Sequence, residues 1–546
     1  MNALKKYTVT GALSFFILIF SGCSDFLNIN EDPNNPTSAT VTQLMPTVQI
    51  DLAGAMGMSI SGLSSITSIF THQVIMRGNL QDYAITGDEF GVLTPWNIIF
   101  PRLLTDIREI IQLGTQNEDW HYVGIAQIMR AYVYSILVDV WGDVPFEDAI
   151  KGAGLRSPSF DSGEDIYPKL FELLDEGMEN LTRSSNLRPG QDDIIYNGDL
   201  DKWRKFAKTL KLKMYNQIRN VQNVSDEVNE LLTEADLLDE DSEFQFPYGT
   251  RVAPSTRNPA YVQEYASGAA RYNVSPYFVE LLSGKNSFFP HNLYDGIVDP
   301  RIPYYFYNQL AESEDPENTP AYRDGRFISV YMFSYNIDPN EGFDQSASQT
   351  VVGLYPVGGR YDNNQDGNEN GRGVRTNLNG AGDTPQRLLT FFARKYIEAE
   401  LALMGVSSGD ARALLEESIL ASFRKLNQVA SRAGAPLISA DDIDEYINSV
   451  LDKYDDADVN GKLEHIITQK WIASYGFGVD SYTDYRRTGF PILHDGNTDN
   501  LDVTVRTRDY PHSFPWPTSE LQVNANAPSQ KNVVSNAARV FWARSN

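Results

Sequence analysis

The sequence predicts a mainly α-helical fold, in which a tetratricopeptide-like scaffold of helix hairpins carries a long, irregular, loop-rich insertion with short β-strands. Two observations predict it. Apolar residues recur at helical spacing on both sides of the middle of the chain, and in the middle Pro, Gly, Asn and Tyr become frequent while the periodicity fades. No clean repeat of about 34 residues is present, so the hairpins are expected to be degenerate repeats separated by insertions. With 546 residues, 42% of them hydrophobic, the chain can bury a large core.

The amino terminus predicts an export signal and a lipid anchor. Two lysines precede an apolar run at 7–20, which is too short for a membrane span of about twenty residues, so 1–22 is expected to be a signal peptide. Cys23 is the only cysteine, and the residues around it resemble a bacterial lipobox, in which the cysteine is lipidated. The alternative is an ordinary signal with a chance cysteine. Residues 23–40 then form the lipidated cysteine and a flexible stalk, and 41–546 form a single domain.

Helices are expected over about 96–222, where three apolar stripes follow one another. Asp199 and Asp201 lie near the start of the third helix, where negative charge is favourable. The stripes are Ile125, Ile128, Met129, Tyr132 and Ile136; Ile166, Leu170, Leu173, Leu174 and Leu181; and Trp203, Phe206, Leu210, Met214 and Ile218.

The remainder of the domain divides into three parts. An irregular ligand-binding lobe is expected over about 239–385, with a β-prone piece at 327–333. Helices return over about 386–476. The carboxyl-terminal part, about 489–546, is rich in Pro and is expected to be extended. The returning helices are predicted from Leu388, Leu389, Phe392, Tyr396, Ala399 and Leu403, from Asp410 onward, at Ala440–Leu451 and at Lys462–Tyr475.

Charge and motif content exclude several functions. The 45 basic and 72 acidic residues give a net charge of −27, which disfavours nucleic acid as a partner. A single cysteine excludes a disulfide framework, and the six histidines show no zinc-ligand spacing. No P-loop, Gly-x-Ser-x-Gly or His-Glu-x-x-His motif is present, so the sequence does not indicate a nucleotide-dependent, serine-hydrolase or zinc-protease mechanism.

Several short segments, in order behind the lipobox, together resemble the SusD/RagB family of outer-membrane nutrient-binding lipoproteins, and more narrowly its SusD-like branch. Each is weak alone, and the order carries the resemblance. The segments are Asp25-Phe26-Leu27-Asn28-Ile29-Asn30, Asn34-Asn35-Pro36-Thr37, Trp96-Asn97, Asp139-Val140-Trp141-Gly142-Asp143-Val144-Pro145-Phe146, Lys202-Trp203-Arg204-Lys205-Phe206-Ala207, Asp299-Pro300-Arg301, Ala399-Glu400, Gln469-Lys470-Trp471 and Tyr485-Arg486-Arg487-Thr488-Gly489-Phe490-Pro491.

The resemblance implies a surface-exposed, lipid-anchored outer-membrane protein that captures oligosaccharides and delivers them to a SusC-type TonB-dependent transporter. It implies binding without catalysis. Some family members capture peptides instead, so RagB-type peptide capture stays an alternative. A further alternative is an assembly lipoprotein that binds only protein partners.

Candidate ligand residues are mostly aromatic, because a flat ring can stack on the apolar C–H face of a sugar. Tyrosines gather in the irregular lobe, and each could instead be a packing residue. The resemblance adds the early loop, since family members also use it for glycan binding. Trp96 either stacks on a sugar or anchors its helix in the core. The candidates are Arg77, Asn79, Tyr83, Trp96, Tyr272, Tyr331, Tyr335 and Tyr361.

The segment from Asp362 to Asn370 resembles the opening of a calcium loop, with oxygen ligands at alternate positions and then a glycine. The candidate calcium ligands are Asp362, Asn364, Asp366 and Asn368. Gly373 occupies position twelve, where an EF-hand needs glutamate. The segment is therefore either a different calcium loop, completed by a remote carboxylate, or a solvated turn. No other cofactor is expected. Arg486 and Arg487 either pair with an acidic ligand or form internal ion pairs or partner contacts.

Overall fold

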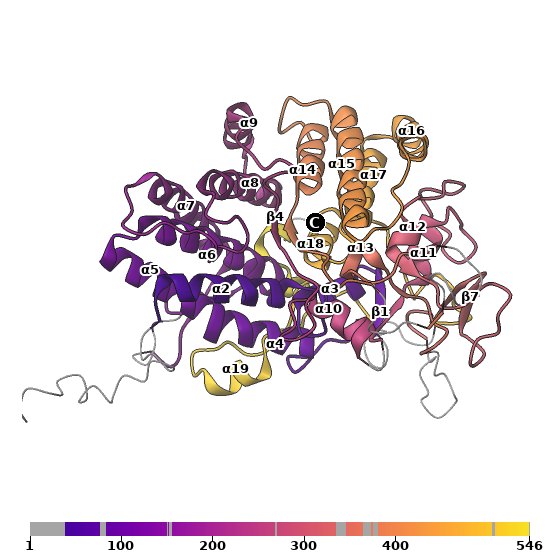
Figure 1. Cartoon of the computed structure of the whole chain (residues 1–546), viewed down its shortest axis with the longest axis horizontal. Coiled ribbons are helices and arrows are strands. Elements are labelled where there is room, and N and C mark those ends of the chain that lie inside the picture. Colours follow the sequence, from indigo (N-terminus) through magenta and orange to yellow (C-terminus); the bar gives the residue numbers. More distant parts are fainter. Residues whose placement is uncertain are drawn as a thin grey trace, which may run out of the picture.

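The computed structural model describes residues 39–76, 83–149, 151, 155–267, 270–334, 346–363, 373–374, 380–504 and 508–544. They are mainly helical, which confirms the predicted fold class (Figure 1). The predicted signal peptide and Cys23 lie outside these residues. The longer helices are α2 (Val41–Met56), α3 (Leu63–Phe70), α4 (Phe90–Ile98), α5 (Leu104–Asn117), α6 (Trp120–Trp141), α7 (Gly163–Thr182), α8 (Leu200–Ile218), α9 (Ser225–Glu234), α14 (Phe391–Leu403), α15 (Ala411–Arg432), α16 (Ala440–Asp456), α17 (Val459–Ala473) and α18 (Gly478–Thr488).

Six of these helices begin at a residue whose side chain accepts from free N–H groups of the first turn. Asp199, predicted near a helix start, caps α8 by accepting from the backbone N–H groups of Asp201 and Lys202. Asp458 caps α17 in the same way. Other side-chain caps are Ser162 for α7, Thr390 for α14, Asp410 for α15 and Ser439 for α16.

The helix α3 lies in a stretch for which no helix was predicted. All eight of its residues are buried. Its apolar residues Leu63, Ile66, Ile69 and Phe70 recur at helical spacing, but the pattern extends over only eight residues, which is too short to indicate a helix by itself.

The helix α6 is the centre of the amino-terminal half. By length and hydropathy it could span a membrane, but 94% of the tested window is buried inside the protein, as in a core helix. It packs closely on α7, where a Cβ atom on Gly124 would come within 2.6 Å of the carbonyl oxygen of Gly177. Small residues at this crossing let the two backbones approach.

The middle of the chain is irregular, with short helices and strands. Its short helices are α10 (Pro259–Tyr261), α11 (Pro276–Leu282), α12 (Ile302–Tyr305) and α13 (Leu354–Val357). A π-helical turn, Val262–Ala266, follows α10, and another, Ile99–Leu103, lies earlier in the chain between α4 and α5. The strands form two-stranded antiparallel pairs: β1 (Val74–Met76) with β5 (Tyr272–Val274), β2 (Val144–Pro145) with β3 (Phe160–Asp161), β4 (Phe244–Phe246) with β10 (Gln386–Leu389), β6 (Phe306–Tyr307) with β9 (Val351–Val352), and β7 (Tyr322–Asp324) with β8 (Phe327–Ser329).

The structure corrects one predicted boundary. Leu388 and Leu389 were assigned to a helix, but they lie in β10, which pairs with β4. The helix α14 begins only after Thr390, whose side chain accepts from the N–H of Ala393. A short apolar run fits a strand or a helix equally well, and here the distant partner strand decides.

The carboxyl-terminal segment returns to the amino-terminal helices. In Figure 1 its short helix α19 (Thr518–Val523) lies below α4. Two 3₁₀ turns follow, at Asn536–Ala538 and Phe541–Ala543. Because this segment crosses back over the chain, residues near both ends of the sequence meet in one region.

Candidate ligand-binding site

Two predicted ligand residues, Tyr83 and Tyr331, lie at the two ends of one series of aromatic rings. The ring centroid of Tyr83 is 5.2 Å from that of Phe333, and Phe333 is 6.0 Å from His494. His494 stacks at 5.4 Å on Phe288, which lies 4.7 Å from Tyr331. We call these five residues the aromatic cluster. It joins the early loop, the irregular middle and the carboxyl-terminal part.

The aromatic cluster has a buried end and an open end. Tyr83, Phe333 and His494 are buried, and Tyr83 is 8% exposed. Phe288 and Tyr331 are partly exposed. The buried rings therefore fix the position of two rings that solvent, or a ligand, can reach.

Several polar atoms at the buried end have no protein partner. The hydroxyl of Tyr83 lies 2.6 Å from Nε2 of His72. Nδ1 of His72 and both ring nitrogens of His494 are buried without a hydrogen bond. The Oδ2 atom of Asp499 lies 3.7 Å from Nδ1 of His494. Burial lowers the pKa of His494 and lowers that of His72 well below its usual range, so both rings are neutral at neutral pH.

A cleft of about 610 Å³ opens beside Tyr83. We call it the Tyr83 cleft. One wall is the segment Tyr83–Gly87, and the other comes from the carboxyl-terminal segment. The charged side chains that line it are Arg508, Asp509 and Lys531. Its volume lies within the range of about 300–1,000 Å³ that small-molecule sites occupy. The other lining residues are Pro515, Thr518, Gln530, Asn532, Val533 and Val534.

The end of α6 holds the second wall in place. The indole Nε1 of Trp141 donates to the carbonyl oxygen of Pro515 at 3.0 Å. The indole of Trp516 donates in return to the carbonyl oxygen of Asp143 at 2.9 Å. The family-like segment 139–146 thus acts on the cleft indirectly, by positioning the carboxyl-terminal segment.

Two predicted ligand residues have no exposed ring face. Trp96 is 3% exposed and its ring lies 4.3 Å from Phe100 and 5.4 Å from Trp141, so it anchors its helix in the core. Tyr272 is fully buried, and its hydroxyl donates to the carbonyl oxygen of Met58 at 2.7 Å. In this structure neither ring can stack on a ligand.

Tyr361 is not part of the aromatic cluster and does not line the Tyr83 cleft. It is partly exposed and packs 4.8 Å from Tyr304, whose hydroxyl donates to the carbonyl oxygen of Pro436. The remaining predicted ligand residues, Arg77, Asn79 and Tyr335, lie outside the described residues.

One of the predicted calcium ligands, Asp362, has protein partners. It is 4% exposed, accepts from Nδ2 of Asn308 at 2.9 Å and pairs with Arg326 at 3.2 Å. Asn364, Asp366 and Asn368 lie outside the described residues. Over the part of the chain that the structure describes, no three His, Cys, Asp or Glu side chains are grouped to hold a metal. A calcium site in this segment stays a prediction.

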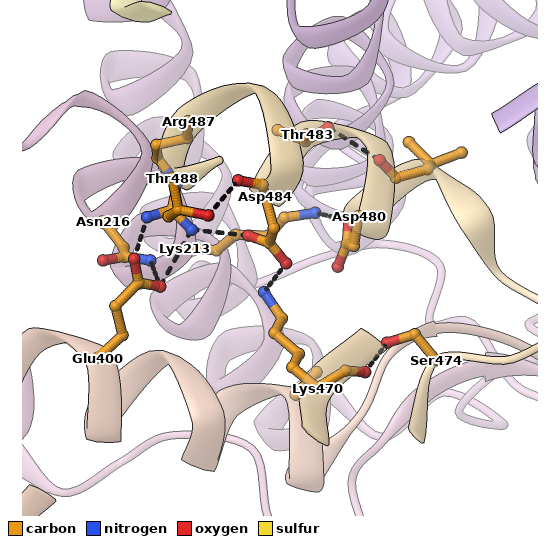
Figure 2. Close-up of polar contacts among 12 residues, drawn as sticks. Lys213, Asn216, Glu400, Lys470, Ser474, Asp480, Thr483, Asp484, Arg487 and Thr488 are labelled. Carbon is orange, nitrogen blue, oxygen red and sulfur yellow. Dashed lines mark hydrogen bonds and ion pairs between the residues drawn. The ribbon is translucent and has the colours of Figure 1, made fainter. Parts of the chain in front are cut away.

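A buried network of charges lies between α8, α14, α17 and α18 (Figure 2). Both guanidinium nitrogens of Arg487 bind Glu400, one of them at 3.0 Å, and Arg487 also pairs with Asp484 at 2.6 Å. Lys470 pairs with Asp484 at 2.7 Å, and Arg219 pairs with Glu400 at 2.8 Å. Burial raises the pKa of Glu400, but Arg219 and Arg487 outweigh it and hold this pKa at about 2.

This charge network is a structural element. Arg487 and Glu400 are fully buried, and the side chains around them pair with one another. Lys213 adds a pair with Asp480 at 2.5 Å. The prediction that Arg487 forms internal ion pairs is therefore confirmed. Arg486 is also buried, but it donates to backbone carbonyl oxygens instead, among them that of His512 at 2.9 Å.

The structure also assigns residues that the sequence did not single out. Phe288 and His494 complete the aromatic cluster, and Lys531 and Arg508 line the cleft. None of them lies in a motif or a periodic stripe. Only the contact between distant segments marks them as part of a site.

A family model described as "Starch-binding associating with outer membrane", SusD-like, matches residues 33–511. A SusD homologue from Bacteroides fragilis is 18% identical, covers 93% of this chain and 100% of its own, and superposes with a TM-score of 0.68. A chitin-binding SusD homologue from Flavobacterium johnsoniae is 18% identical, with 92% and 97% covered and a TM-score of 0.62. A SusD/RagB family protein from Bacteroides thetaiotaomicron is 20% identical, with 93% and 99% covered and a TM-score of 0.62. No curated protein matches.

Proposed function

This chain belongs to the SusD-like family, and from that premise we propose that it is a cell-surface lipoprotein that captures oligosaccharides and delivers them to a SusC-type TonB-dependent transporter. The family's description as starch-binding and associated with the outer membrane supports a nutrient-binding role. The oligosaccharide ligand and the transporter partner are parts of the proposal.

The observation that carries the proposal is the aromatic cluster with the Tyr83 cleft beside it. Phe288 and Tyr331 leave part of their rings open, and a sugar ring can stack on such faces through its C–H groups. The polar lining of the cleft, at the Tyr83 end of the cluster, offers partners for sugar hydroxyls. A concave site with a few polar groups among apolar ones is typical of small-molecule binding.

We propose that Cys23 carries the lipid that tethers the protein to the outer membrane, facing the cell exterior. In cells that lack the transporter, a Cys23→Ala variant should then leave the outer-membrane fraction, because the lipid that tethers it to the membrane would be missing. Fractionation followed by immunoblotting measures this. If the variant stayed in the outer membrane as the unaltered protein does, the anchor would be refuted.

The proposed role is binding without turnover. An oligosaccharide incubated with the pure protein should keep its chain length, which chromatography of the sugar measures. The appearance of shorter products, above a heat-inactivated control, would contradict this part of the proposal.

The main test is calorimetric titration of residues 24–546 with neutral and acidic oligosaccharides and with a peptide digest, with and without calcium. Saturable binding of a glycan class supports sugar capture and identifies the ligand. Heat from the digest alone would indicate peptide capture. No heat from any ligand, together with co-purification of the transporter, would indicate an assembly lipoprotein.

A further inference from the structure

Lys531 lines the Tyr83 cleft without a carboxylate partner. Its Nζ donates to the carbonyl oxygen of Trp141 and lies 4.4 Å from the ring centroid of Trp516. Among the residues that the structure describes, no carboxylate lies within 4.0 Å of Nζ to form an ion pair. An ammonium group has three N–H donors, so donors remain for a ligand.

This lysine differs from the other buried lysines of the protein. Removing an ammonium group from water is costly unless an opposite charge compensates it. Burial lowers the pKa of Lys531 to about 7, as expected for a cation that lacks such compensation. The others each have a carboxylate: Lys213 pairs with Asp480 at 2.5 Å, Lys425 with Glu243 at 2.5 Å and Lys470 with Asp484 at 2.7 Å.

The charges around Lys531 are balanced, although the whole chain carries −27: two are positive and two are negative. Arg508 lines the same cleft, where Asp509 is the one carboxylate among the lining residues. Arg486 acts on Lys531 as a second positive charge, and Asp143 as the opposing negative one. Arg486 is itself bound by carbonyl oxygens and not by a carboxylate.

We propose that the Tyr83 cleft binds the carboxylate of an acidic sugar, such as a uronic acid unit, through the Nζ atom of Lys531. The inference rests on the proposed function, because it names the glycan class that the site would take. A bound carboxylate would supply the opposite charge that the protein itself does not place beside this lysine. Hydrogen bonds between charged partners are stronger than neutral ones, so the carboxylate should add selectivity.

The test compares an oligogalacturonate with its methyl ester, in which each carboxylate charge is replaced by a neutral ester. We expect the acid to bind at least about tenfold more tightly than the ester at pH 6.5. Lys531→Met keeps an unbranched apolar side chain and removes the charge, so it should bring the two affinities together. Lys151→Met, which removes an exposed lysine far from the cleft lining, should leave the ratio unchanged.

A second measurement needs no variant and therefore does not depend on Lys531→Met folding. The acid-to-ester affinity ratio of the unaltered protein should fall between pH 6 and pH 9, because only the protonated amine attracts the carboxylate and its pKa without ligand is about 7. The charged or titratable groups around the amine are Asp143, Arg486, Arg508, Asp509 and Tyr83. A ratio that stays constant over this range would overturn the role of Lys531.

The remaining outcomes separate the two proposals. Equal binding of acid and ester would overturn this inference and leave sugar capture standing. An unchanged preference in folded Lys531→Met would also overturn it. Binding of an acidic peptide but of no sugar would show that the cleft takes a carboxylate from another source and would overturn both proposals. No binding of any sugar, neutral or acidic, would refute the proposed function itself.

Discussion

The charge network and the aromatic cluster are both buried polar regions, but they satisfy their polar groups differently. In the network, Glu400, Asp484 and Asp480 each pair with cations of the same chain. In the aromatic cluster and its cleft, both ring nitrogens of His494 lack a hydrogen bond, and the ammonium group of Lys531 has no carboxylate partner among the described residues. The comparison indicates that the charges of the network are paired within the protein and stabilise the fold, whereas polar groups of the cluster and cleft can be paired by a bound ligand.

The largest effect should come from breaking the network. Glu400→Gln would leave Arg219 and Arg487 buried with reduced charge compensation, and breaking such a pair costs about 3–5 kcal/mol. Urea unfolding measures the loss. As a control, Asp201→Asn removes a 75%-exposed partner of Arg204 and should cost less than about 1 kcal/mol. Equal losses in the two variants would contradict the view that the network stabilises the fold.

Lowering the pH should remove the stabilising contribution of the aromatic cluster first and that of the charge network second. Burial lowers the pKa of His494 in the folded protein below its ordinary value of 6.5. The contribution of this histidine to stability is therefore present above pH 6.5 and is lost as the pH falls below it. Glu400 has its pKa lowered from 4.5 to about 2, so its contribution is lost only as the pH falls from about 4.5 towards 2.

The urea midpoint as a function of pH measures both steps. His494→Phe keeps a flat ring and should reduce the step near pH 6, to which the other buried histidines also contribute, whereas Glu400→Gln should reduce the step below pH 4.5. If both variants kept both steps, the titrating groups would have to be sought elsewhere in the chain.

A substitution at the open end of the aromatic cluster should have the smallest effect on stability. It should still have a measurable effect on ligand binding. Tyr331→Ala should weaken the binding of the captured glycan by about 1 kcal/mol or more, because a stacking face is lost. Tyr215→Ala is a matched control, since this partly exposed tyrosine also packs on a phenylalanine, Phe171, at 4.3 Å, but outside the site. Calorimetry compares the two. Equal affinities would remove Tyr331 from the site.

Much of the fold could be predicted from local sequence. Caps such as Asp199 and Asp410 set where helices begin, because a side chain next to the first turn satisfies its N–H groups. The prediction was wrong where local signals were ambiguous, as at Leu388 and Leu389, whose strand depends on a partner far along the chain. It gave no helix at α3, because the apolar pattern there extends over only eight residues.

The candidate site was less predictable. Tyr83 and Tyr331 were singled out as separate residues, and the structure joins them through Phe333, His494 and Phe288. A tyrosine in the core and one on a ligand face look alike in sequence, because the ring suits both environments.

By itself, the sequence determined the helical class of this protein, some helix starts such as those at Asp199 and Asp410, the candidate anchor at Cys23 and the ordered segments that resemble the SusD/RagB family. These depend on residues that are neighbours along the chain. Only the tertiary structure decided which rings meet, that Arg487 lies in a closed network and that Lys531 lines a cleft with no carboxylate paired to it among the described residues. Burial and charge pairing depend on which distant segments pack together, and spacing along the chain does not set that.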